Sequence, residues 1–301
     1  MKIPNSLVGT LCVATAALAL TACSEERTNT APKADQGVVD QASSACSSIA
    51  SKYPSLKGKT INVGSSPGQN YYDFVDEKEP SKVIGLEPDL VNTIGKCAGF
   101  TVNYQKIDFD GLIPALTSNR IDLITSGMYA TPERAKKVNF VSYMKAAEAA
   151  VVRKGNPKKI TGLETLCGTT IAQVAGTVEV EIASKEDAKC KAAGKPAIKF
   201  LNFTDNNGLT QALSGGRADV FLTDAGVAAY LAKQYASSLE KGFDIVSDFK
   251  FGIGVSKNNA DLLGAVKDGL TALYDKGELK TVATKWGFSE GQLVAPAAVT
   301  G

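Results

Sequence analysis

The stretch that decides the fold is Gly111-Leu-Ile-Pro-Ala-Leu-Thr-Ser-Asn-Arg-Ile-Asp122, because it recurs as Gly208-Leu-Thr-Gln-Ala-Leu-Ser-Gly-Gly-Arg-Ala-Asp219. Six positions are identical in the two copies, namely Gly, Leu, Ala, Leu, Arg and Asp. Each copy has the pattern of an amphipathic helix, a tight turn and the start of a buried strand. Two amphipathic helices can match over so short a stretch by chance, but a true repeat predicts two similar α/β lobes.

Helices and strands are predicted to alternate on both sides of the two copies. Strands are expected at 60–64, 101–105, 121–125, 149–153, 169–174, 197–201 and 218–222, and helices at 88–98, 109–119, 258–276 and 278–286. This alternation predicts an α/β fold with mostly parallel sheets. Ligands of such sheets bind beyond the carboxyl ends of the strands. We therefore expect segments 126–131 and 223–225 to face each other across a cleft.

The N-terminus is typical of an exported lipoprotein. Lys2 is followed by an apolar, alanine-rich stretch at 7–20, which is the layout of a secretory signal peptide and too short to span a bilayer comfortably. The sequence Leu20-Thr-Ala-Cys23 resembles a bacterial lipobox. We expect a signal peptide at 1–22, lipid on Cys23, and an anchor and linker at 23–56. A plain secretory signal with a chance cysteine is the alternative.

Charge and cysteine content narrow the possible functions. The chain has 33 basic and 31 acidic residues without a basic block, so nucleic acid is not an expected partner. It has no histidine and no CxxC spacing, so neither a metal site nor a cofactor is expected. Once the signal peptide and Cys23 are set aside, four cysteines remain, which allow three pairings. Their order along the chain favours Cys46–Cys97 and Cys167–Cys190.

Several motifs together resemble one protein family. Ser126-Gly-Met-Tyr-Ala-Thr-Pro-Glu-Arg134 resembles the central signature of the bacterial extracellular solute-binding protein family 3, the polar amino-acid-binding proteins of ABC transporters. Further stretches resemble other motifs of that family, in the family's order and spacing: Gly85–Leu90, Phe109–Leu116, Leu166–Ala172, Val174–Thr177, Asp275–Lys280 and Lys285–Phe288. The resemblance covers the chain from about Thr60 to Phe288.

The resemblance implies a two-lobed, type-II periplasmic-binding-protein-like α/β fold with a hinge and an interlobe cleft. The expected boundaries are 57–154 plus 249–291 for the discontinuous first lobe, 155–248 for the second lobe and 292–301 for a tail. The chain is expected to cross between the lobes near 154–156 and near 247–250.

The resemblance also implies a ligand clamp. Arg134 matches an arginine that binds the ligand carboxylate, a role that suits its planar fork of N–H donors. Asp224 matches an aspartate that receives the ligand ammonium. Taken alone, the residues equally allow a solvated Arg134 on a surface helix and an Asp224 that only caps the helix after it.

Other ligand-binding residues are expected around this pair: Gly127, Tyr129, Thr131, Phe109, Gly176, Thr177 and Tyr72. The two glycines could instead form ordinary turns, and Phe109 could belong to the core. Tyr129 departs from the family pattern, since many relatives carry Thr or Ser there. The longer side chain would reshape the pocket, so a ligand other than a standard α-amino acid stays open.

The predicted function is capture of an amino acid or a similar small molecule as the substrate-binding component of an ABC uptake transporter. The expected partners are the small-molecule ligand, the permease subunits and, through the lipid anchor, the membrane. We expect a monomer that faces the periplasm or the cell exterior and is not an enzyme. Two alternatives are a periplasmic dehydratase-type enzyme, which would need Glu, Asp, Lys or Tyr as its acid or base, and a sensing partner of a membrane receptor.

Overall fold

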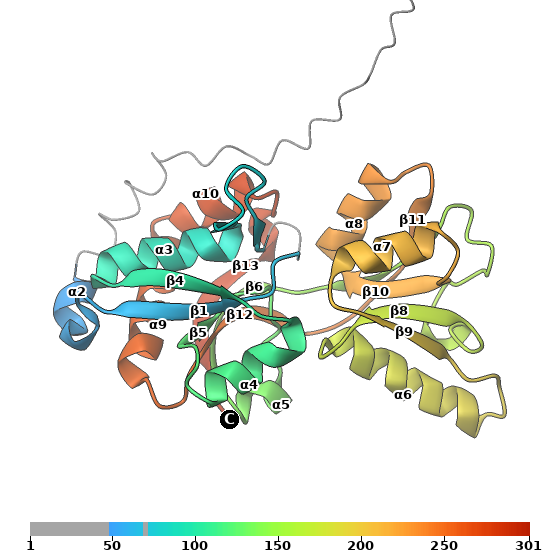
Figure 1. Cartoon of the computed structure of the whole chain (residues 1–301), viewed down its shortest axis with the longest axis horizontal. Coiled ribbons are helices and arrows are strands. Elements are labelled where there is room, and N and C mark those ends of the chain that lie inside the picture. Colours follow the sequence, from blue (N-terminus) through green and yellow to red (C-terminus); the bar gives the residue numbers. More distant parts are fainter. Residues whose placement is uncertain (1–47, 69–71) are drawn as a thin grey trace, which may run out of the picture. The chain divides into compact units, whose positions relative to one another are not determined.

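The computed structural model describes residues 48–68 and 72–301, and two mixed β-sheets organise them (Figure 1). The first sheet has six strands, in the order β13 (Leu293–Val299), β6 (Asn139–Lys145), β12 (Lys250–Val255), β5 (Leu123–Ile124), β1 (Thr60–Ser65) and β4 (Thr101–Lys106). The second has five, in the order β11 (Leu239–Ile245), β7 (Glu148–Arg153), β10 (Val220–Asp224), β8 (Thr170–Val174) and β9 (Lys199–Phe203). A small sheet pairs β2 (Phe74–Val75) with β3 (Val83–Ile84).

Helices cover both faces of each sheet. The first lobe carries α2 (Ile49–Lys52), α3 (Leu86–Ala98), α4 (Leu112–Thr117), α5 (Pro132–Ala135), α9 (Ala260–Asp275) and α10 (Glu278–Lys285). The second carries α6 (Val178–Ala192), α7 (Asn206–Ser214) and α8 (Ala225–Gln234). Helices α3 and α4 lie on opposite sides of the first sheet, and α6 and α7 on opposite sides of the second (Figure 1). The predicted two-lobed α/β fold is confirmed.

The repeated stretches make the same hydrogen bonds in the two lobes. The backbone N–H of Asn62 in β1 donates to the Asp122 carboxylate, and that of Thr170 in β8 donates to Asp219, each at 2.9 Å. In return, the backbone N–H of Asp122 donates to the carbonyl of Asn62 at 2.7 Å, and that of Asp219 donates to the carbonyl of Thr170 at 2.8 Å. The aspartates thus fix the start of β5 against β1 and of β10 against β8. The repeat is therefore structural rather than a chance match.

In each sheet, only three neighbouring strands at one end are parallel. In the first lobe β1 runs parallel to β4 and β5, and in the second β8 runs parallel to β9 and β10. The remaining neighbours are antiparallel, so the expectation of mostly parallel sheets was too strong. Because parallel strands end at one edge of a sheet, the loops after β5 and β10 are available for a ligand.

The first crossing between lobes lies earlier than the sequence indicated. Strand β7, which was expected to belong to the first lobe, pairs with β10 and β11 in the second sheet. The chain therefore crosses at Ala146–Ala147, and the boundary at 154/155 is corrected. Strands β6 and β7 are both almost fully buried, so their apolar sequence gives no sign of where one sheet ends. The chain returns to the first sheet between Ile245 and Lys250.

The C-terminal segment is also a correction. Residues 292–301 were expected to form a tail, but β13 pairs antiparallel with β6 at the edge of the first sheet. The register shifts between Leu293 and Ala297, around Pro296. An edge strand tolerates a proline, because the N–H that it lacks is not needed for pairing.

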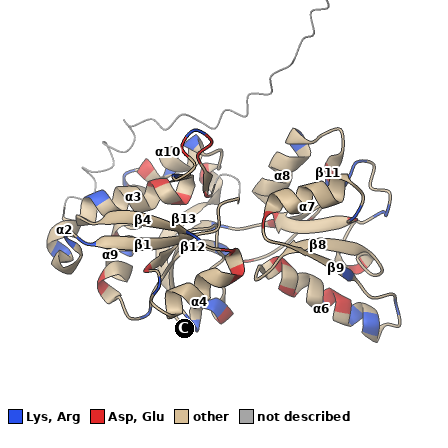
Figure 2. Cartoon of the chain, in the orientation of Figure 1, with Lys and Arg blue, Asp and Glu red and all other residues tan. Residues whose placement is uncertain are grey.

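Both lobes have apolar cores built from large buried side chains, among them Trp286, Tyr143, Phe140 and Phe221. Helices α3 and α9 pack so closely that a Cβ on Gly269 would come within 2.7 Å of the Ile94 side chain. Among the described residues, no helix is long and apolar enough to cross a membrane. Lys and Arg are spread over the helices and loops of both lobes (Figure 2).

The predicted Cys167–Cys190 disulfide is confirmed, with Cα atoms 5.6 Å apart. It ties the segment before β8 to the end of α6. Cys97 is buried, and its predicted partner Cys46 lies outside the described residues, as do Cys23 and the signal peptide at 1–22. The Cys46–Cys97 pair and the lipid anchor therefore stay predictions.

The disulfide should contribute measurably to stability. It closes a loop with a sequence separation of 23, and chain entropy then predicts that Cys167→Ser combined with Cys190→Ser lowers the free energy of unfolding by about 3 kcal/mol. Urea unfolding of the oxidised variant and wild type measures this difference without disturbing other cysteines. An unchanged midpoint would show that the link does not constrain the unfolded chain.

Candidate ligand-binding site

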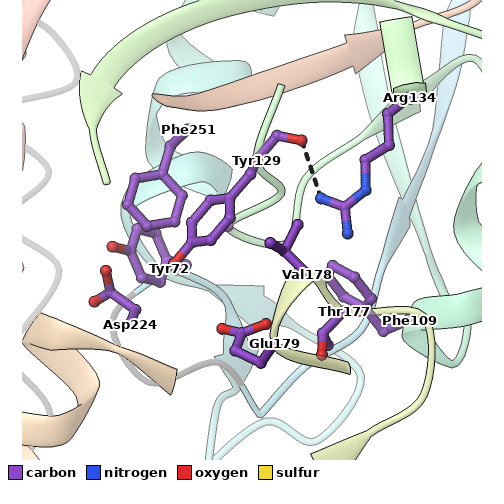
Figure 3. Close-up of a pocket in the computed structure, with 10 residues that line it drawn as sticks. Tyr72, Phe109, Tyr129, Arg134, Thr177, Val178, Glu179, Asp224 and Phe251 are labelled. Atoms are coloured by element: carbon purple, nitrogen blue, oxygen red, sulfur yellow. Dashed lines mark hydrogen bonds between the residues drawn. The ribbon is translucent and has the colours of Figure 1, made fainter. Parts of the chain in front are cut away.

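A cleft lies where loops of the two lobes meet (Figure 3). The first lobe lines it with Tyr72, Phe109, Gly127, Tyr129, Arg134 and Phe251. The second lobe lines it with Thr177, Val178, Glu179 and Asp224. Seven of the predicted ligand-binding residues are in this lining, whereas Thr131 and Gly176 are not.

Arg134 reaches from the first lobe to the second. It lies on α5, which Thr131 caps by accepting a hydrogen bond from the Arg134 backbone N–H at 3.3 Å. Its side chain donates to the carbonyl of Tyr129 at 2.9 Å and to that of Gly176, in the second lobe, at 3.0 Å. Its guanidinium carbon lies 5.5 Å from the centre of the Phe109 ring. Arg134 is only 9% exposed, so the alternative of a solvated surface arginine is wrong.

Gly176 permits the close approach that this contact requires. Its φ of 78° lies in the left-handed region, which glycine adopts without the steric cost that a Cβ brings. A Cβ there would also come within 2.8 Å of the Asp110 backbone in the first lobe. The glycine thus acts through its shape and its carbonyl, at a point where the two lobes touch.

Asp224 both caps a helix and lines the cleft. It ends β10, and its carboxylate accepts hydrogen bonds from the backbone N–H groups of Gly226 and Val227 at the start of α8, at 2.9 and 3.2 Å. The residue is 7% exposed. Burial raises the pKa of Asp224 to about 6, although both capping bonds lower it. The carboxylate is ionised above that pH and can then accept a cation.

Two acidic residues beside Asp224 escaped the sequence analysis. Glu179, in the first turn of α6, lines the cleft. Glu148 begins β7 directly opposite Asp224 in the antiparallel register. It is fully buried, and neither carboxylate oxygen has a hydrogen-bond partner in the described part of the chain. A single acid inside the apolar run 146–152 was the signal that could have revealed Glu148.

The pKa values of Glu148 and Glu179 are raised above their ordinary value. Burial raises the pKa of Glu148 to about 8, and Glu179 and Asp224 add to the rise while Arg134 opposes it. Burial likewise raises the pKa of Glu179. Among the described residues, no cluster of three or more His, Cys, Asp or Glu side chains is arranged to hold a metal ion.

The rings of Tyr72, Tyr129 and Phe251 form an aromatic wall of the cleft, next to Asp224 (Figure 3). The centres of the Tyr72 and Phe251 rings are 4.4 Å apart, and those of Tyr129 and Phe251 are 4.8 Å apart. Tyr129 also stacks on Phe249 at 5.5 Å. Gly127 has a φ of 56° and would place a Cβ 2.9 Å from the Tyr72 ring. The absence of a side chain at Gly127 therefore lets Tyr72 fill this wall.

A buried glutamate holds the Gly127 loop in place through a hydrogen bond. Glu87 accepts hydrogen bonds from the Gly127 backbone N–H at 2.9 Å and from the Tyr143 hydroxyl at 2.8 Å. Burial raises the pKa of Glu87 to about 7, against these two hydrogen bonds. One Glu87 oxygen therefore holds the Gly127 loop, and the other binds Tyr143 in β6.

The family comparison decides what kind of cleft this is. The model for bacterial extracellular solute-binding proteins, family 3, matches residues 61–290. The chain belongs to this family.

Curated relatives and solved structures of other proteins similar to this chain agree with this assignment. The arginine-binding protein ArgT of Corynebacterium glutamicum is 27% identical over 234 residues, which cover 77% of this chain and 76% of that protein. The L-cystine-binding protein TcyJ of Escherichia coli is 26% identical over 217 residues, covering 72% and 79%. An ancestral arginine-binding protein bound to arginine superposes with a TM-score of 0.70 at 32% identity, covering 77% of this chain and 99% of that one. The ancestral amino acid-binding protein AncCDT-1, a precursor of cyclohexadienyl dehydratase, gives 0.65 at 30% identity, covering 75% and 95%.

Family members are extracellular or periplasmic and serve amino-acid ABC transporters, and relatives of this chain are binding proteins rather than enzymes. The protein is thus a substrate-binding component, as predicted. Of the two solved structures, AncCDT-1 bears on the alternative of a dehydratase-type enzyme, as a precursor of a dehydratase that is itself named an amino acid-binding protein.

The buried charge of Glu148 should make the ligand-free protein less stable as the pH rises. The pKa of about 8 in the folded state exceeds the ordinary value of 4.5, so only the folded state keeps this proton at intermediate pH, and stability falls as the pH rises from about 5 to 8. Glu148→Gln, whose amide resembles the protonated acid, should therefore raise the free energy of unfolding by roughly 1–3 kcal/mol at pH 8.5 and little at pH 5.5.

Thermal unfolding at the two pH values measures this effect. Glu181→Gln is the matched control, because Glu181 is exposed on the same helix as Glu179. Equal pH dependence in Glu148→Gln and wild type would show that Glu148 does not hold the proton.

Proposed function

We propose that this solute-binding protein captures a free amino acid by its two backbone charges, with Arg134 binding the carboxylate and Asp224 the ammonium. The observation that carries the proposal is their placement: both are less than a tenth exposed and line one cleft from different lobes. Figure 3 shows them on opposite sides of the cleft with Tyr129 between. A zwitterion held at both ends would link the two lobes.

The geometry leaves Arg134 able to take a carboxylate. A guanidinium has five N–H donors, and the bonds to the carbonyls of Tyr129 and Gly176 use two. The contact with Phe109 and the bond to Tyr129 hold the planar group in place, so little side-chain entropy remains to be lost on binding. A ligand carboxylate would also meet a charge that water screens poorly, because the site is buried.

Binding would then promote closure of the lobes. A ligand shifts a two-state equilibrium only if it contacts one state better than the other. A ligand clamped between Arg134 and Asp224 satisfies this condition, because only the closed arrangement brings both charges onto it. We propose that permease subunits recognise this arrangement, that the protein releases its ligand unchanged, and that it acts as a monomer tethered through lipid on Cys23.

The relatives suggest which ligand to test first. Two of them are named as arginine-binding and one as L-cystine-binding. A thermal-shift screen of L-amino acids should therefore begin with arginine and include cystine, histidine and glutamine. A ligand present at 100 times its Kd should add about 2.7 kcal/mol of stability.

The clamp can be tested without damaging the helix cap. Asp224→Asn removes the charge but keeps a side chain that caps as well as aspartate does. Arg134→Lys keeps the charge but removes the fork. Breaking a desolvated charge contact costs about 2–5 kcal/mol, so Asp224→Asn should lose roughly thirtyfold or more in affinity by calorimetry with the ligand from the screen. Arg134→Lys should bind more weakly than wild type and still melt cooperatively.

Asp205→Asn is the matched control. Asp205 caps α7 in the same lobe by accepting from the Gly208 backbone N–H at 2.8 Å, outside the cleft. The Asp205→Asn variant should bind the ligand with the affinity of wild type. Full affinity in Asp224→Asn would mean that Asp224 is only a helix cap.

A further inference from the structure

We propose that Glu179 and Glu148 form a cation-binding subsite beside the amino-acid clamp, so that the preferred ligand carries a second positive group in its side chain. This inference rests on the proposed clamp by Arg134 and Asp224 and names the class of amino acid that it selects.

The cleft is lined by more acidic than basic side chains. Arg134 is the one basic residue among the described residues that line it, whereas Glu179 and Asp224 are both acidic. An α-amino acid brings one carboxylate for Arg134 and one ammonium for Asp224. A neutral side chain would then leave Glu179 without a countercharge in a closed cleft, and unpaired buried charge is costly.

Glu148 lies next to Asp224 in the second sheet. Residues directly opposite in an antiparallel pair project from the same face of the sheet, with Cβ atoms about 4.5–5.5 Å apart. Glu148 is opposite Asp224, so its carboxyl lies on the face from which Asp224 lines the cleft. The ionisable groups that act on it are Glu179, Asp224 and Arg134, two acids and one base.

Glu148 also has unused capacity to bind. The residue is fully buried, and both of its oxygens lack a hydrogen-bond partner within the described chain. Buried polar atoms are nearly always paired in folded proteins. A guanidinium or ammonium group supplies the several N–H donors that this carboxyl and Glu179 would accept.

The aromatic wall suits the same kind of group. The rings of Tyr72, Tyr129 and Phe251 are packed together next to the acids. A cation over an aromatic face gains electrostatic energy, most of all where water is excluded. Acids and rings that lie next to each other therefore select a planar or compact organic cation.

The test compares L-arginine with L-citrulline by calorimetric titration of the full-length protein. The two amino acids have the same length, but the citrulline side chain ends in a neutral urea. Wild type should bind arginine at least about thirtyfold more tightly, as expected for a buried charge pair. Glu179→Gln and Glu148→Gln should each reduce this preference to a few-fold by weakening arginine binding while leaving citrulline binding nearly unchanged.

The variant Glu181→Gln is the control and should keep the preference of wild type, because Glu181 is exposed. A structural role for Glu179 or Glu148 would weaken the two ligands equally, and that result would overturn the proposal. So would tighter binding of citrulline or glutamine than of arginine by wild type, although the clamp would then stand. If no amino acid binds, both the clamp and the subsite are wrong.

Discussion

The hydrogen bond from Arg134 to the carbonyl of Gly176 is the interaction on which the cleft depends. It joins the first lobe to the second at 3.0 Å through a guanidinium that is almost wholly buried. A buried permanent charge must keep polar partners, and the carbonyl of Tyr129 accepts a second hydrogen bond from the Arg134 guanidinium. Thr131 caps the helix that carries Arg134, and the Phe109 ring packs against the guanidinium. The residues around the cleft therefore serve one requirement, which is to hold a positive charge between two lobes.

The fold brings the opposing acids to that charge through its repeat. Asp122 and Asp219 fix β5 and β10 against their parallel neighbours in the same way, so the loops after these strands open at corresponding edges of the two sheets. One loop leads to Arg134, and β10 itself ends in Asp224. The acids bring a cost, since burial raises the pKa of Glu148 and of Asp224 and disfavours their ionised forms. Such a cost is expected where a site must bind charge.

Much of this could be predicted from the sequence, and the rest could not, for physical reasons. The repeat gave the two lobes, and the order of the family motifs gave Arg134 and Asp224 as cleft residues. Local patterns could not show that the chain changes sheets at 146–147, because β6 and β7 are equally buried, nor that Pro296 sits in an edge strand. Glu148 was missed because its place beside Asp224 comes from pairing of strands far apart in the chain.

The central claim is that the cleft has more acidic than basic side chains and that the ligand supplies the positive group that these acids bind. The most direct measurement is proton release on binding L-arginine at pH 7, from calorimetry in buffers of different ionisation enthalpy. Glu148 has a pKa of about 8 in the ligand-free protein, so it is mostly protonated at pH 7 and should ionise when a cation arrives. The account predicts release of up to about one proton per arginine bound. Binding without proton release, or with proton uptake, would contradict it.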